Sequence, residues 1–156
     1  MPSPEQYSVF VDLSAKIEAW DSLSVVVVAN GHAYALCLPA HVKTAIRNAL
    51  PAGQEPPQFA IFAAAIYLTM RPHLAQIKRV RVDMDYSGIV AERAIRRRLL
   101  ELVRRDMPQF KGSNIRIETV AGTRADTMAR KCYRGKQATD GEITLAQLED
   151  VLGVKG

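Results

Sequence analysis

Three aspartates in this chain stand where separate elements could bring them to one place. Asp12 ends an apolar, strand-like run, Asp85 ends a second run, and Asp126 opens a helix after a third. Carboxylates at strand ends and at a helix start can converge on one ion, although the sequence separates them widely. Mg²⁺ prefers such hard oxygen ligands and keeps several waters, so a few carboxylates suffice. The pattern predicts a Mg²⁺-dependent phosphoryl-transfer site.

Asp83 is a candidate fourth ligand, because successive strand side chains alternate between faces and Asp83 would share a face with Asp85. Asp83 could instead hydrogen-bond within the sheet, or pair with Arg81 or Arg116. The sequence is compatible with both interpretations. The metal-binding set that we predict, for Mg²⁺ or Mn²⁺, is Asp12, Asp83, Asp85 and Asp126, with Asp12, Asp85 and Asp126 as the catalytic residues.

The chemistry of such a site is in-line hydrolysis of a phosphodiester. Two ions about 4 Å apart would make a water nucleophilic and stabilise the leaving oxygen. Without metal, clustered carboxylates repel one another. Replacing Asp12 or Asp85 by Asn should therefore be neutral or stabilising in the metal-free protein, whereas replacing a structural aspartate should destabilise it.

The net charge of +5 is distributed unevenly. Residues 71–136 hold 17 of the 21 Lys and Arg residues but only 7 of the 16 acids, whereas residues 1–70 are slightly acidic. A strongly basic region attracts polyanions, of which nucleic acid is the commonest. A solvated basic face that aids solubility is the alternative explanation.

Many of these basic residues fall on an amphipathic helix predicted at 89–105 and on the helix that Asp126 opens. The arginines of the first helix could pair with Glu92 and Glu101 at helical spacing, but they outnumber the acids. The nucleic-acid-binding residues that we predict are Arg93, Arg96, Arg97, Arg104, Arg124, Arg130, Lys131 and Arg134.

Size and composition indicate one globular domain spanning residues 1–156, in which 136–156 form a C-terminal extension with a short helix. The two cysteines lack metal-ligand spacing. The start of the chain does not read as a signal peptide, and the longest apolar run, 59–70, is too short to span a bilayer. We therefore expect a cytoplasmic protein with no membrane partner. The sequence does not predict its oligomeric state.

The apolar periodicity predicts an α/β protein with a five-stranded mixed sheet, three antiparallel strands being followed by parallel ones with crossover helices. Asn30 and Gly31 predict a two-residue type I′ hairpin turn. We expect His41 and Lys43 to be exposed on a short helix. The predicted strands are 7–14, 23–29, 32–38, 80–85 and 115–120, and the predicted helices are 39–50, 59–70, 89–105, 123–133 or 126–133, and 144–152.

This order of elements, with acids on the first strand, the fourth strand and the last core helix, resembles the ribonuclease H-like superfamily. Local sequence is similar over Phe10–Ser14, Ile61–Leu68, Val82–Ser87 and Ala125–Arg130, within a region covering 7–133. The resemblance implies that the first aspartate bridges two metal ions and that the other two each hold one side. It also implies that helices of the basic region follow the substrate backbone.

Two features depart from that family. It places a Glu near the start of the first core helix, where this chain has Ala60, with Gln58 and Glu55 as the nearest polar residues. The loop before Asp126 also lacks the His that many cellular ribonucleases H place there.

Together, the pattern of aspartates and the resemblance predict a metal-dependent nuclease acting on RNA in an RNA–DNA hybrid, or on another structured RNA or DNA. The alternatives are a binding module with a decayed site and a protein-interaction scaffold.

Overall fold

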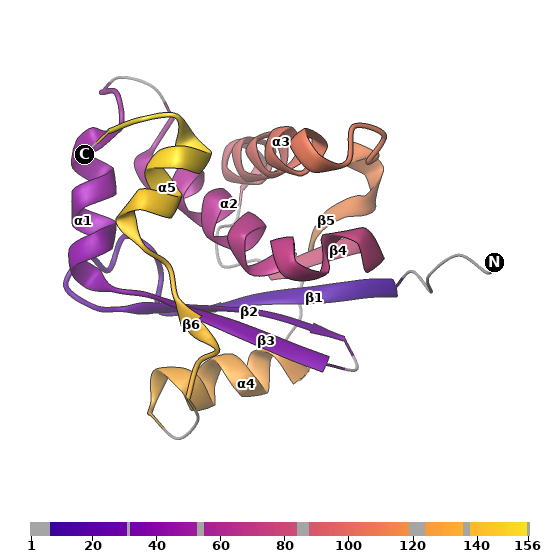
Figure 1. Cartoon of the computed structure of the whole chain (residues 1–156), viewed down its shortest axis with the longest axis horizontal. Helices are drawn as coiled ribbons and strands as arrows, with labels where there is room; N and C mark the ends of the chain where they lie inside the picture. Colours follow the sequence, from indigo (N-terminus) through magenta and orange to yellow (C-terminus); the bar gives the residue numbers. More distant parts are fainter. Residues whose placement is uncertain are drawn as a thin grey trace.

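The computed structural model describes residues 7–30, 32–52, 55–83, 88–118, 124–135 and 138–155. In these ranges a mixed sheet of six strands is combined with five α-helices and two short 3₁₀ helices (Figure 1). The strands are β1 (Tyr7–Ser14), β2 (Ser24–Asn30), β3 (His32–Leu38), β4 (Ile77–Asp83), β5 (Ile115–Glu118) and β6 (Gly141–Glu142). The helices are α1 (Ala40–Ala49), α2 (Pro57–Met70), η1 (Arg71–Gln76), α3 (Ile89–Asp106), η2 (Gly112–Asn114), α4 (Arg124–Tyr133) and α5 (Leu145–Leu152).

The sheet has the strand order β5-β4-β1-β2-β3-β6. Strands β1, β4 and β5 are parallel to one another, β2 is antiparallel to both β1 and β3, and β6 is parallel to β3. The α/β class and the mixed sheet agree with the sequence prediction. The difference is β6, a strand of two residues that is too short to carry an alternating pattern.

Helices α1, α2, α3 and α5 lie on one face of the sheet, which we call the four-helix side (Figure 1). Alternate strand residues such as Val9, Val11, Val80 and Val82 point to this side and are almost completely buried. Helix α2 is apolar all round and is buried from Ala60 to its end, as expected of a helix enclosed on every side.

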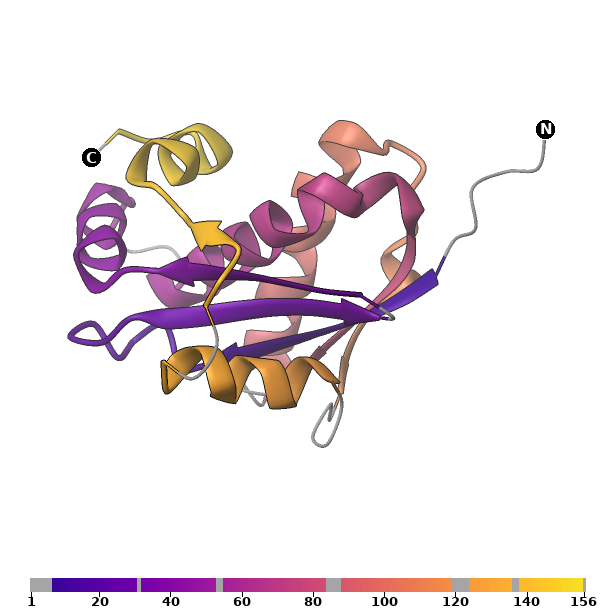
Figure 2. The same cartoon turned by 60° about the horizontal axis from the view of Figure 1, so that its bottom comes forward.

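Helix α4 covers the opposite face alone, lying across β1, β2 and β3 (Figure 2). We call this face the α4 side. Here Met128, Ala129 and Cys132 pack on Val25 and Val27 of β2 in a second, smaller core. The charged residues of β4 and β5 point to the same face beyond this core, so only part of it is apolar.

The β2–β3 hairpin forms as the sequence predicts, but with another register. Asn30 pairs with His32, whereas a two-residue turn would pair Ala29 with His32. Gly31, on which the predicted type I′ turn depends, lies outside the described residues.

Lys43 is fully buried, so the prediction that it is exposed is wrong; His41 is exposed as expected. The Lys43 Nζ donates hydrogen bonds to the carbonyl of Ala19 at 2.8 Å and to the Ser24 Oγ at 3.0 Å. Burial lowers the pKa of Lys43, and Glu18 opposes that effect. The lysine therefore ties α1 to the loop that precedes β2.

The segment after α4 belongs to the main fold. Residues Gly141 and Glu142 pair with β3, and α5 packs on α1 and α2. Helix α5 begins at a capping box in which Thr144 and Gln147 each bond the other's backbone N–H. Among the helices in the described ranges, none has both the length and the apolar composition that a membrane span requires.

Candidate functional site

Asp12 lies in β1, and strand alternation turns its side chain to the α4 side, since Val11 and Leu13 belong to the core of the four-helix side. It pairs with Val27, a member of the second core. The residue is only 5% exposed. Its Oδ1 accepts a hydrogen bond of 2.9 Å from the N–H of Leu13, which helps to fix the orientation of the carboxylate.

Asp83 lies beside Asp12 in the sheet. Val11 of β1 pairs with Val82 of β4, so the two aspartates are the next residues on adjacent parallel strands. Both point away from the four-helix side, because the valines that precede them belong to its core. The sheet therefore brings together two of the four predicted metal ligands.

Glu118 continues this row of acids on β5, where it pairs with Asp83. Its carboxylate also forms an ion pair with Arg81, with 3.2 Å between Oε1 and Nε. Arg81, one of the partners considered for Asp83, is thus paired with Glu118. Three neighbouring strands present an acidic residue to the α4 side near their carboxyl ends.

The other two predicted ligands are described only in part. Asp85 lies outside the described residues. Asp126 lies in the first turn of α4, and its side chain is outside the described set. Within the part of the chain that the structure describes, no group of three or more His, Cys, Asp or Glu side chains is close enough to hold a metal ion.

The course of α4 indicates the level of Asp126 relative to β1. Burial raises the pKa of the Cys37 thiol, and the nearby Cys132 adds a smaller contribution in the same direction. Cys37 is in line with Ser14 across the sheet, so the last turn of α4 lies near the end of β1. Asp126 precedes Cys132 by roughly 9 Å along the helix axis, a length that corresponds to about three strand residues. Helix α4 and β1 run in the same direction (Figure 2), so the first turn of α4 lies nearer the amino end of β1 than the last turn does.

The basic helix and the predicted acids lie on opposite faces of the sheet. Arg93, Arg96, Arg97 and Arg104 all lie on α3, which covers the four-helix side, whereas Asp12 faces the α4 side. The helix follows β4 directly in sequence, but the sheet separates it from the strand residues that point the other way.

Several α3 arginines also have contacts within the fold. Arg96 donates to the carbonyl of Gly112 at 3.0 and 3.2 Å, and Arg104 donates to the carbonyl of Phe110 at 2.9 Å. These bonds join α3 to the segment that leads into β5. Among the described residues, the ion pairs found for α3 arginines are with Glu55, and not with Glu92 or Glu101, the alternative partners considered from the sequence.

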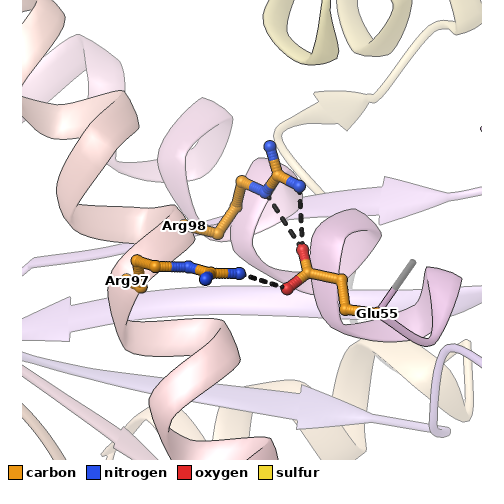
Figure 3. Close-up of polar contacts among 3 residues, drawn as sticks. All are labelled: Glu55, Arg97 and Arg98. Carbon is orange, nitrogen blue, oxygen red and sulfur yellow. Dashed lines mark hydrogen bonds and ion pairs between the residues drawn. The ribbon is translucent and has the colours of Figure 1, made fainter.

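Glu55 forms ion pairs with two α3 arginines, with 2.8 Å between the carboxylate oxygen and the guanidinium nitrogen in each pair (Figure 3). Its side chain is 14% exposed, and it bonds Arg97 through Oε2 and Arg98 through Oε1. Glu55 therefore anchors the start of α2 to α3. Ala60, at the position of the family's Glu, is buried with 3% of its surface exposed.

The remaining predicted basic residues lie on or beside α4. Lys131 and Arg134 are exposed, and the side chains of Arg124 and Arg130 are outside the described set. On the α4 side the sequence analysis missed Arg81 and Arg116 as binding candidates. Their signal was the alternation of arginine with Val or Ile in β4 and β5, which gains meaning only when the strand order is known.

Other candidate groups lie apart from the row of acids. Trp20 and Tyr86 are aromatic residues of the kind that can stack on bases. Trp20 lies under the Arg47 guanidinium at 4.5 Å, and Tyr86 lies outside the described residues. Cys37 and Cys132 form no disulfide. Burial raises the pKa of the Cys132 thiol, which favours the protonated form and low reactivity. Comparison of the chain with models of protein families, with curated proteins and with solved structures gave no match in any of the three.

Proposed function

We propose that this protein is a metal-dependent nuclease of the ribonuclease H-like type, acting on an RNA–DNA hybrid or another structured nucleic acid. The observation that carries the proposal is the placement of Asp12 and Asp83 side by side on parallel strands, on the face that α4 covers. The order of elements, with three antiparallel strands before two parallel ones and α4 after the second of these, is the order on which the resemblance rests.

The donor set suits the proposed ion. Asp12 and Asp83 are carboxylates, which Mg²⁺ and Mn²⁺ prefer to the thiols and imidazoles that zinc sites use. Asp85 and Asp126 would complete the set. A bound ion would supply Lewis-acid stabilisation of the phosphodiester and a more acidic water.

The chain's own residues contribute orientation and exclusion of water. The Leu13 N–H holds Oδ1 of Asp12, so this carboxylate is oriented before any ion or substrate arrives. Val27 and the residues of α4 enclose it from one side, which lowers the local dielectric and strengthens its interaction with a cation. On the other side, β4 and β5 offer a charged, partly exposed sheet surface for a nucleic-acid strand.

The first test is cleavage of a labelled RNA–DNA hybrid, duplex DNA, branched DNA and single strands in Mg²⁺, Mn²⁺ or chelator. We expect metal-dependent cleavage of at least one substrate. Asp12→Asn should lower the rate by about 100-fold or more, since even residues that only orient metal ligands contribute 10–100-fold. Asp150→Asn, an exposed change on α5, is the matched control and should leave the rate unchanged.

Thermal melts without divalent ions distinguish an aspartate that binds metal from one that stabilises the fold. The Asn side chain keeps an oxygen that can accept from Leu13, and it removes repulsion between Asp12 and Asp83. Asp12→Asn should therefore melt at the same temperature as the wild type, or higher. A markedly lower melting temperature, or cleavage that persists in the variant, would show that Asp12 is not a metal ligand.

A second candidate function is a nucleic-acid-binding module that does not cleave. Ala60 favours it, because the position where the family has a metal-binding Glu is buried and apolar here, and Glu55 is occupied by two arginines. In that case the wild type would retain nucleic acid in a salt-sensitive manner but leave it intact with every metal tested.

A further inference from the structure

Arginines gather around a small pocket between β4 and the turn that leads into β5. The pocket has a volume of about 220 Å³ and is lined by Arg79, Arg81, Arg116, Ser113 and Asn114, together with Val80. Among its described lining residues none is acidic. Pockets for drug-sized ligands start at roughly 300 Å³. The size therefore suits a small anion with a few waters.

The charge of this pocket is permanent, because the guanidinium group cannot lose its proton in proteins. Arg79 and Arg116 are exposed, and the side chain of Arg81 is 40% exposed. Glu118 compensates the charge of Arg81, while Arg79 and Arg116 add two further positive groups beside it, which an anion between them would stabilise. Guanidinium groups bind phosphate oxygens through paired hydrogen bonds, and the hydroxyl of Ser113 and the amide of Asn114 can add further donors.

Arg81 is held in place from two sides. Its Nε contacts the Glu118 carboxylate at 3.2 Å, and its guanidinium carbon lies 5.4 Å from the centre of the Phe10 ring. The fork of hydrogen-bond donors is therefore largely oriented before an anion binds, which lowers the entropy cost of binding.

The pocket is also at a defined distance from the acids. Arg81 precedes Asp83 by two residues on the same side of β4, and Arg116 precedes Glu118 in the same way on β5. Two strand residues span about 7 Å. One strand of a nucleic acid carries a phosphate for each rise of about 3.4 Å. A phosphate in the pocket would thus lie one or two nucleotides from a phosphodiester at the acids.

We propose that Arg79, Arg81 and Arg116 bind a backbone phosphate of the nucleic-acid strand whose neighbouring phosphodiester lies at Asp12 and Asp83. The inference rests on the proposed function, because it names the substrate group that the sheet positions for cleavage. It also replaces α3 by the β4–β5 surface as the place where the strand is held.

The test uses fluorescence anisotropy of a short labelled RNA–DNA hybrid in Ca²⁺ over a series of salt concentrations. The proteins compared are the wild type, Arg79→Ala/Arg116→Ala and Lys155→Ala. The double variant should bind roughly 10-fold or more weakly, and the slope of log affinity against log salt should fall by about 1. Lys155, exposed after α5, is the control for loss of charge and should change neither quantity.

A second arm uses inorganic phosphate alone, followed by the amide resonances of residues 113–116. Wild type should show saturable shifts that the double variant lacks. Melting temperatures of both proteins should agree, since the substituted arginines are exposed. Arg116→Lys, which keeps the charge but loses the fork, should have intermediate affinity for the hybrid.

The outcomes separate the pocket from the nuclease. If the wild type cleaves and the double variant binds the hybrid with unchanged affinity and slope, the pocket proposal is wrong and the nuclease stands. If phosphate shifts and slope respond as expected but no metal supports cleavage, the pocket stands and the nuclease does not. If the wild type binds neither hybrid nor phosphate, the pocket proposal is overturned, and the cleavage assay on the other substrates decides the nuclease.

Discussion

The two faces of the sheet differ most at β4 and β5. On the four-helix side these strands present Val80, Val82 and Ile115, which are buried in a continuous core. On the α4 side the neighbouring residues include Arg81, Asp83, Arg116 and Glu118. Helix α4 covers β1, β2 and β3, and the described residues of the smaller core lie on these strands and on α4.

This difference indicates which face provides stability and which is open to a ligand. Burial of apolar surface is the main favourable term in folding, and four helices supply it on one side. The α4 side combines a small core with charged side chains that the fold leaves partly exposed. A charged sheet surface is costly to cover, so its retention favours a role in binding.

The largest expected contrast comes from two adjacent valines of β2 that are both fully buried but face opposite sides. Val26→Ala should destabilise the protein by about 2–3 kcal/mol, because α2 and its neighbours prevent the cavity from closing. Val27→Ala should cost about 1–2 kcal/mol, since α4, a single helix, can shift toward the strand. Urea unfolding of both variants measures the difference.

The slope of the urea transition serves as a control, because equal slopes show that both variants unfold from comparable states. Hydrogen exchange in α4 should increase in Val27→Ala and not in Val26→Ala. Equal losses of stability in the two variants would contradict the distinction between the two cores.

A smaller effect is expected at Lys43, a fully buried charged residue on the four-helix side. Lys43→Met keeps most of the volume but leaves the carbonyl of Ala19 and the hydroxyl of Ser24 without this donor. The expected loss at neutral pH is about 1–3 kcal/mol. A gain of stability would show that the cost of burying the charge exceeds the value of its hydrogen bonds.

The pH dependence at Lys43 has a definite sign. Its pKa in the folded protein is lowered below the ordinary value of 10.5, chiefly by burial. Between the two values the unfolded chain binds more protons, so this group makes the folded state more stable as pH rises toward 10.5. The stability difference between wild type and Lys43→Met should therefore increase from pH 7 toward 10.5, measured by urea unfolding at each pH. A constant difference would contradict the lowered pKa.

The smallest effect is expected at Glu55, where two ion pairs join α2 and α3. Arg97 is 66% exposed in its side chain, so the pair with it should contribute little. Glu55→Gln should cost about 1 kcal/mol or less in urea unfolding, with Glu101→Gln on the exposed surface of α3 as its control. It should not change hybrid affinity, because α3 lies on the side away from Asp12. If Glu55→Gln bound the hybrid more tightly than the wild type, α3 would be part of the nucleic-acid-binding surface after all.

The sequence was sufficient for most individual elements. The alternation around Val9 and Val11, the apolar run of α2 and the capping box at Thr144 and Gln147 each contain their own local signal. Tertiary context decides what the sequence left open. Lys43 is buried because its Nζ reaches acceptors in a loop 19–24 residues earlier, a contact that no local pattern encodes.

The candidate site was predictable only where it depends on strand alternation. Asp12 of β1 and Asp83 of β4 lie on the same face of the sheet. Each directly follows a core valine on its own strand, and the two strands are parallel neighbours. The side of the sheet on which the α3 arginines lie could not be predicted, because helical spacing shows that α3 is amphipathic but not which face of the sheet it covers. The pocket at Arg79 and Arg116 joins two strands separated in sequence by α3, so it could be found only from the pairing of β4 with β5.

The place of α5 in the first core has a consequence for the protein during its synthesis. Ile143, Leu148 and Val151 fill the space beside α1 and α2, which are made long before them. At 5–20 residues per second, the roughly 80 residues that separate α2 from Val151 take about 4–16 s to add. Over that interval the nascent chain presents an uncovered apolar surface on α1 and α2, which is the kind of surface that a ribosome-associated chaperone binds.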